Sequence, residues 1–121
     1  MGGRGAESGL VSRVPNANKA TIADSKITKW LLDPAKKHYQ EFAAVGYSEN
    51  NPEILRNDLL KGIKENTAMT FEANEYGDRM FNVDMFLGVN RKERFRTSWQ
   101  IDKGKNYPRL VTAFRIGAKR K

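Results

Sequence analysis

Two short stretches of this 121-residue chain carry side chains that could act on a phosphodiester. The first is residues 36–38, Lys-Lys-His, in which an imidazole follows two ammonium groups. The second is residues 92–102, KERFRTSWQID, which hold two arginines, a threonine and a tryptophan. An imidazole can transfer protons near neutral pH, and cations can offset the charge that develops on phosphorus. These residue types therefore suit acid–base cleavage of a nucleic acid.

The histidine allows two interpretations. His38 is the only histidine in the chain, so any catalysis by imidazole must use it. A lone histidine on an apolar helix face is more often a packed residue than a catalyst. Against that, Lys36 and Lys37 directly precede it. Two ammonium groups within reach of a phosphate would leave the imidazole well placed for proton transfer.

Residues 92–102 are predicted to form a strand with two different faces, because strand side chains alternate. One face carries Phe95, Thr97, Trp99 and Ile101, and the other carries Arg94, Arg96, Ser98 and Gln100. The basic face could bind phosphates, or it could be a solvated stripe balanced by Asp84 and Glu93. The tryptophan could stack an unpaired base, but its apolar neighbours favour a place in the core.

Composition restricts the function further. The 22 Lys and Arg exceed the 14 Asp and Glu, which gives a formal net charge of +8. This charge favours a polyanionic partner, although a basic surface that only maintains solubility would give the same value. Without cysteine and with one histidine, the chain has no Cys-based zinc site, thiol nucleophile or multi-His metal site. We predict no metal and no cofactor.

Other enzyme classes lack their motifs. The acids nearest the predicted strands, Asp84, Glu93 and Asp102, are not followed two residues later by the lysine of PD…(D/E)xK nucleases. No GxSxG nucleophile elbow is present. No apolar run approaches the ~18 residues of a membrane span, and the N-terminus lacks the apolar core of a signal peptide. We therefore expect no membrane insertion by this domain itself.

Helices are predicted in the first half of the chain. Residues 1–19 are rich in Gly, Ser and Asn and are predicted to be a flexible leader before a single domain over residues 20–121. Asp24 is the predicted N-cap of a short first helix. A second helix is predicted over residues 33–46, from an Asp-Pro start to a Gly stop, and a third over 51–66.

Strands are predicted in the second half. They cover residues 80–87, 92–102 and 110–116, with turns at 88–91 and 103–108. Helices followed by antiparallel strands indicate an α+β fold. We expect the N-terminal helices to pack on one face of a twisted antiparallel β-meander and to leave the other face free.

Part of the chain resembles a family of bacterial toxins. The run KKHYQEF at residues 36–42, then Gly-Tyr at 46–47 and Thr-Ser-Trp at 97–99, resemble motifs of the tRNase domain of colicin D and related contact-dependent growth inhibition toxins. The resemblance covers residues 22–114. It implies the barnase/EndoU/colicin/RelE type of fold, with N-terminal helices against a twisted antiparallel sheet that carries the active site.

The resemblance also implies roles for individual residues. His38 matches the family's catalytic histidine, Lys37 the lysine before it, Thr97 its hydroxyl residue and Trp99 its tryptophan. The family's second lysine falls on an alanine here, so Lys36 would take its place from a different angle.

This assignment conflicts with the alternation of the strand, which places Thr97 and Trp99 on the apolar face. Arg96 on the other face is therefore a rival catalytic candidate. Three further arginines, Arg94, Arg109 and Arg115, are candidates for contacts with RNA.

The predicted activity is metal-independent cleavage of tRNA by transphosphorylation, which leaves 2′,3′-cyclic phosphate and 5′-hydroxyl ends. The resemblance implies the C-terminal module of a larger delivery protein, a secreted or cell-surface effector of a bacterium that acts in the target-cell cytoplasm. It also implies a cognate immunity protein, which the basic site predicts to be acidic. The alternative is a non-catalytic basic RNA-binding module, which would not need His38.

Overall fold

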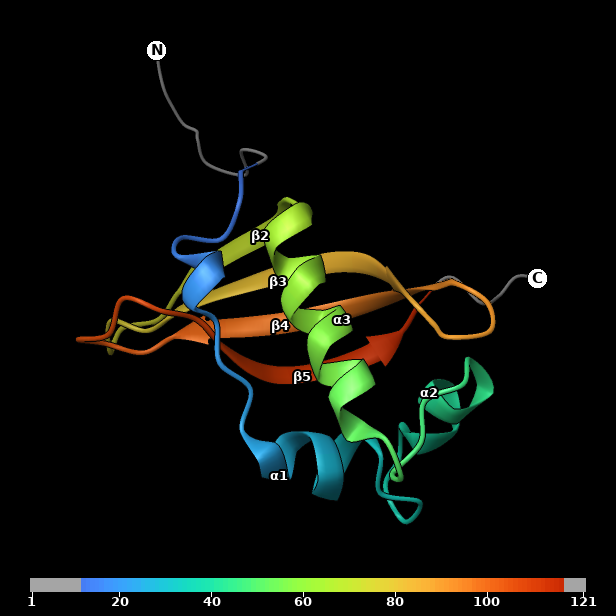
Figure 1. The fold of residues 1–121 in the computed structure, drawn as a ribbon. Coiled ribbons are helices and arrows are strands. Elements are labelled where there is room, and N and C mark those ends of the chain that lie inside the picture. The colour runs from blue at the N-terminus through green and yellow to red at the C-terminus, as the bar shows by residue number, and fades with distance from the viewer. Residues whose placement is uncertain (1–11, 117–121) are drawn as a thin grey trace.

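The computed structural model describes residues 12–116, in which helices cover one face of an antiparallel sheet (Figure 1). The helical elements are η1 (Ala17–Lys19), α1 (Asp24–Lys26), the π-helical turn η2 (Ile27–Leu31), α2 (Tyr39–Ala44) and α3 (Pro52–Glu65). The strands are β2 (Ala68–Ala73), β3 (Arg79–Leu87), β4 (Glu93–Ile101) and β5 (Arg109–Arg115). Neighbouring strands follow the chain order β2-β3-β4-β5, and every pair is antiparallel. The predicted α+β meander is confirmed.

The helix α3 lies across the sheet, and its bounds follow the sequence signals. Pro52 stands at its first position, and Leu55, Leu59 and Ile63 repeat at four-residue spacing and are buried. Gly62 faces β3 closely, because a Cβ atom there would lie 2.3 Å from the sulfur of Met85. Helix α3 therefore packs closely on this face of the sheet and buries its side chains.

The second helix is shorter than predicted. It begins at Tyr39, because the carboxylate of Asp33 accepts the backbone N–H of Ala35 at 2.9 Å and holds residues 33–38 in turns. Its predicted end is confirmed, since Gly46 has a φ of 103°. The shorter helix leaves His38 at its N-terminal boundary, where the preceding turns can reach the edge of β5.

The folded domain begins earlier in the chain than residue 20, where the predicted leader ends. Val14 is only 2% exposed, Arg13 donates a hydrogen bond to the backbone oxygen of Lys64, and Ser12 forms a bridge with Ala68. Residues 12–19 are thus part of the folded domain, and residues 1–11 of the predicted leader lie outside the described residues.

The first helix also differs from the prediction. Asp24 lies within its first turn instead of capping it, and its carboxylate pairs with Arg56. The helix then widens into the π-helical η2, which buries Ile27 and Leu31 but leaves Trp30 exposed.

The strand β4 keeps the predicted alternation. Phe95, Thr97, Trp99 and Ile101 are buried under the helices, whereas the residues between them are exposed or half-buried on the open face. The prediction of two chemically different faces is confirmed.

The strand β5 departs from strict alternation through a bulge. Ser98 pairs with Thr112, but the next residue on β4 pairs with Leu110, so Val111 is an extra residue. The bulge turns Leu110 toward the core and Thr112 toward the open face, where Phe114 pairs with Arg96.

Among the residues that the structure describes, no helix combines the length and the apolar character needed to cross a membrane.

Candidate active site at the edge of β5

A pocket of about 310 Å³ lies between the first helical segment, the turns at 33–38 and the edge of β5. The side chains around it are Lys26, Trp30, Leu31, Lys36, Lys37, His38, Val111 and Thr112. In Figure 1, α1 and α2 flank β5 on this side of the sheet. The structure thus brings the predicted Lys-Lys-His run together with Trp30 and Thr112, which the sequence did not place there.

The imidazole of His38 is held by two contacts, one of which is itself anchored to β5. Its Nδ1 lies 3.1 Å from Oε1 of Glu41, and the same oxygen accepts the backbone N–H of Arg115 at 2.9 Å. Its ring stacks on Phe114 with 5.7 Å between the ring centroids. Because a carboxylate accepts hydrogen bonds, Nδ1 carries the hydrogen and Nε2 of the neutral ring has its lone pair free. The contacts therefore define the orientation of the ring, and the carboxylate favours the tautomer that carries its hydrogen on Nδ1.

The environment of the three pocket lysines contains no ion pair from the described residues. Within residues 12–116, no carboxylate forms an ion pair with Lys26, Lys36 or Lys37. The Nζ atoms of Lys36 and Lys26 instead lie 4.9 and 5.5 Å from the ring centre of Trp30. Three ammonium groups are consequently available to a bound anion.

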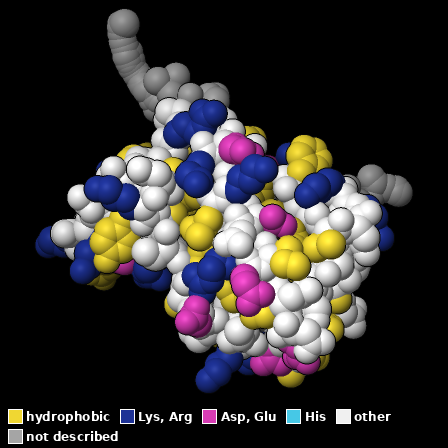
Figure 2. Space-filling view, in the orientation of Figure 1, with side chains coloured by type: hydrophobic (Ala, Val, Ile, Leu, Met, Phe, Trp, Pro, Cys, Tyr) yellow, Lys and Arg dark blue, Asp and Glu magenta, His cyan; other side chains and the backbone are white. Residues whose placement is uncertain are grey.

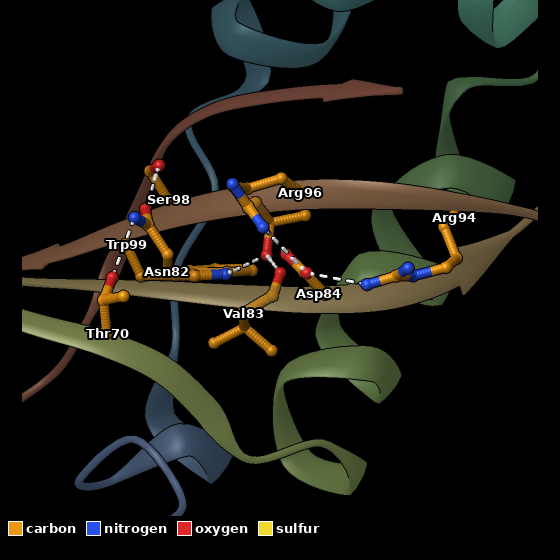
Figure 3. Close-up of polar contacts among 9 residues, drawn as sticks. Thr70, Asn82, Val83, Asp84, Arg94, Arg96, Ser98 and Trp99 are labelled. Carbon is orange, nitrogen blue, oxygen red and sulfur yellow. Dashed lines mark hydrogen bonds and ion pairs between the residues drawn. The ribbon is translucent and has the colours of Figure 1, made fainter. Parts of the chain in front are cut away.

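The arginines of β4 have a different environment. Asp84 accepts two hydrogen bonds from Arg96, at 2.8 and 3.0 Å, and one from Arg94 at 3.1 Å (Figure 3). The hydrogen bond to Asp84 raises the pKa of the Arg96 guanidinium, which therefore stays charged. The basic stripe predicted on this face is thus largely paired, and the role of Arg96 in catalysis stays a prediction.

The other two arginine candidates are also paired. Arg109 donates two hydrogen bonds to Asp102, at 2.7 and 3.1 Å, and these bonds are the main reason that the pKa of the Asp102 carboxyl is lowered. Arg115 donates to Glu93 at 3.1 Å. Both arginines remain partly exposed, so their contacts with RNA stay a prediction.

Thr97 and Trp99 lie away from any such site. Both are 0% exposed on the helix-covered face. The Thr97 hydroxyl donates to the backbone oxygen of Val83 at 2.7 Å and accepts the indole N–H of Trp99 at 2.7 Å. The alternation of β4 thus directs both side chains into the core, and the active-site role that the resemblance implies for them stays a prediction.

The open face and the helix face are both mixed in charge. On the open face, Ser98 donates to Asn82 and Asn82 donates to Thr70, which forms a neutral ladder across three strands (Figure 3). On the helix face, basic side chains are interspersed with acidic and hydrophobic ones (Figure 2). The pocket at the β5 edge is thus distinguished by the gathering of Lys26, Lys36 and Lys37 around His38 and Trp30.

Several members of the site were missed from the sequence, among them Glu41, Trp30, Lys26 and Thr112. Glu41 stands three residues after His38, and this spacing is a usable signal, since residues three apart share a helix face. Trp30 carries no such local signal, because its approach to Lys36 depends on the tertiary fold. In the part of the chain that the structure describes, no group of three or more His, Cys, Asp or Glu side chains could hold a metal ion.

Comparison with known proteins gives one match. No curated protein and no solved structure matches the chain. The family model of a domain of unknown function, DUF6883, matches residues 13–117, which is most of the chain. The protein therefore belongs to the DUF6883 family.

Proposed function

We propose that this protein is a metal-independent endoribonuclease whose active site is the pocket at the β5 edge. One observation carries the proposal: the Glu41 carboxylate orients His38, so that within residues 12–116 Nε2 has no hydrogen-bond partner and the neighbouring lysines have no acidic partner. This arrangement resembles the general one in which a carboxylate orients a histidine and stabilises the imidazolium that forms during proton transfer.

The proposed reaction is an internal transphosphorylation. Nε2 of His38 takes the proton of the RNA 2′-hydroxyl while the 2′-oxygen forms a bond to the adjacent phosphorus. The bond from phosphorus to the 5′-oxygen breaks, and the imidazolium returns the proton to that leaving oxygen. The products are a 2′,3′-cyclic phosphate and a 5′-hydroxyl. Lys36 and Lys37 stabilise the charge on the phosphorane oxygens.

The biological setting of the proposal rests on the resemblance to colicin D-type toxins. From this resemblance we propose that the substrate is tRNA. We also propose that the domain is the C-terminal module of a larger effector that is delivered into a target cell. This setting also requires an immunity protein in the producing cell. Because no carboxylate of the described residues pairs with the pocket lysines, an immunity protein that places carboxylates over them would both neutralise and block the site.

A non-catalytic RNA-binding module is the second candidate. The observation that favours it is the exposed Trp30 beside two lysines, which can bind RNA without any proton transfer. Such a module has no use for the orientation of His38 by Glu41, so measurement of cleavage separates the two candidates.

Wild-type protein incubated with bulk tRNA in EDTA is expected to release fragments with 2′,3′-cyclic phosphate and 5′-hydroxyl ends. The reason is that all the proposed chemistry comes from His38 and the lysines. Mapping the ends of the fragments tests this result. Cleavage only after addition of Mg²⁺ would contradict the mechanism, and binding without cleavage would favour the RNA-binding module.

The double substitution of Lys36 and Lys37 by alanine is expected to flatten the dependence of RNA affinity on salt. Each lost phosphate contact should reduce the slope of log K against log salt by about one unit. Binding titrations between low and moderate salt measure this slope. The matched control is Lys61→Ala with Lys64→Ala on the exposed side of α3, which removes the same charge. Equal slopes for the two double variants would place the phosphate path elsewhere.

A further inference from the structure

We infer that the pocket at the β5 edge binds one unpaired nucleotide, with its base stacked on Trp30 and its flanking phosphates held by Lys26 and Lys36. The inference rests on the proposed function for the identity of the ligand as RNA. It adds the part of the substrate that is recognised: a nucleotide in a single strand or loop.

The exposure of Trp30 is the first observation. This side chain is 55% exposed, whereas Ile27 and Leu31 in the same π-helical turn are buried. The other tryptophan, Trp99, is completely buried in the core. The indole of Trp30 therefore contributes little to the core, and it forms part of the wall of the pocket.

The two lysines are the second observation. Lys36 and Lys26 each place an amine against the ring of Trp30, at 4.9 and 5.5 Å from its centre. Such cation–π contacts hold the amines beside the ring face without satisfying them as a carboxylate would. A base that stacks on Trp30 would displace an amine from the ring, and the phosphates of the same nucleotide would receive it.

The size and frame of the pocket are the third observation. A volume of about 310 Å³ is near the lower end of small-molecule sites, which span about 300 to 1,000 Å³. At one end of β5 Thr21 pairs with Arg109, and at the other Glu41 accepts the N–H of Arg115. A pocket of this volume, with backbone contacts at both ends of β5, suits one extruded nucleotide and not a duplex.

The position of His38 in the same pocket wall relates recognition to cleavage. Because Trp30 and His38 line one pocket, the phosphate next to the stacked base lies toward the imidazole. The structure thus assigns the cut to a phosphodiester adjacent to the recognised nucleotide.

The test compares two single-stranded probes of equal charge: a 2′-O-methyl oligouridine heptamer, which lacks the nucleophile, and an abasic heptamer with the same phosphates. Trp30→Ala is expected to weaken binding of oligouridine roughly 5- to 100-fold and to leave binding of the abasic probe unchanged. Trp30→Phe keeps an aromatic face and should stay within a few-fold of wild type. In the Trp30→Ala variant the buried Trp99 is the one remaining tryptophan, so its fluorescence reports whether the core is intact.

An equal loss of affinity for both probes, or no loss for either, would overturn the inference. Protein that binds oligouridine through Trp30 but does not cut tRNA would support the inference and refute the ribonuclease. If the wild type cuts tRNA but Trp30→Ala binds both probes as tightly as wild type, the inference would be refuted and the ribonuclease supported.

Discussion

Replacement of His38 by alanine is expected to abolish cleavage of tRNA in EDTA while the fold and the affinity for RNA stay close to wild type. A positioned acid–base group typically contributes about 10²- to 10⁴-fold to the rate. Few stabilising contacts are lost, because the ring is partly exposed and stacks only at the surface on Phe114. Single-turnover cleavage measures the rate, and a salt-matched binding titration measures the affinity.

Glu41→Gln is the control for this substitution. Its amide oxygen can still accept from Nδ1 of His38 and from the N–H of Arg115, but the negative charge that stabilises an imidazolium is lost. We expect a slower enzyme with the same fold. Undiminished cleavage by purified His38→Ala protein would remove the imidazole from the mechanism.

Replacement of Trp99 by alanine is expected to lower the free energy of unfolding by about 3 to 5 kcal/mol, the usual loss for a large buried aromatic residue. Domains of this kind are stable by about 5 to 15 kcal/mol, so the variant would be close to unfolding. The physical reason is the cavity left under the helices, where Trp99 is among the largest buried side chains. Urea denaturation measures the loss.

Thr97→Val serves as the partner experiment. Valine nearly keeps the volume but removes the oxygen that accepts the indole N–H of Trp99, and a buried donor without an acceptor costs about 1 to 3 kcal/mol. Thr97→Ser keeps that oxygen and should be milder. A Trp99→Ala protein that is as stable as wild type but cannot cut RNA would restore the active-site role implied by the resemblance.

The parts of the fold that the sequence predicted well depend on local periodicity. The spacing of Leu55, Leu59 and Ile63 defines α3, and the alternation in β4 defines which side chains are buried. Two departures from the predicted elements arose where a local feature interrupts the pattern. The carboxylate of Asp33 holds turns in place of a first helical turn, and Val111 adds a residue to β5.

The candidate site was only partly predictable for a different reason. Lys36, Lys37 and His38 are adjacent in sequence, so their proximity required no tertiary information. Arg94 and Arg96 pair with Asp84 because of the register of β3 and β4, which local sequence does not give. The sequence alone therefore could not show that these arginines are paired while the pocket lysines remain available. The resemblance to colicin D-type tRNases stays a prediction, since the chain's own family is a domain of unknown function.

The bond between Glu41 and the backbone of Arg115 also has a consequence for the order of folding. It joins positions 74 residues apart, from the second helix to the last described strand. During synthesis the helices emerge first, and β5 cannot hold the Glu41 carboxylate or stack Phe114 on His38 until it has been made and has paired with β4. Partly synthesised chains, or chains threaded unfolded through a narrow passage, would therefore lack the complete candidate site, which forms only when the final strand docks.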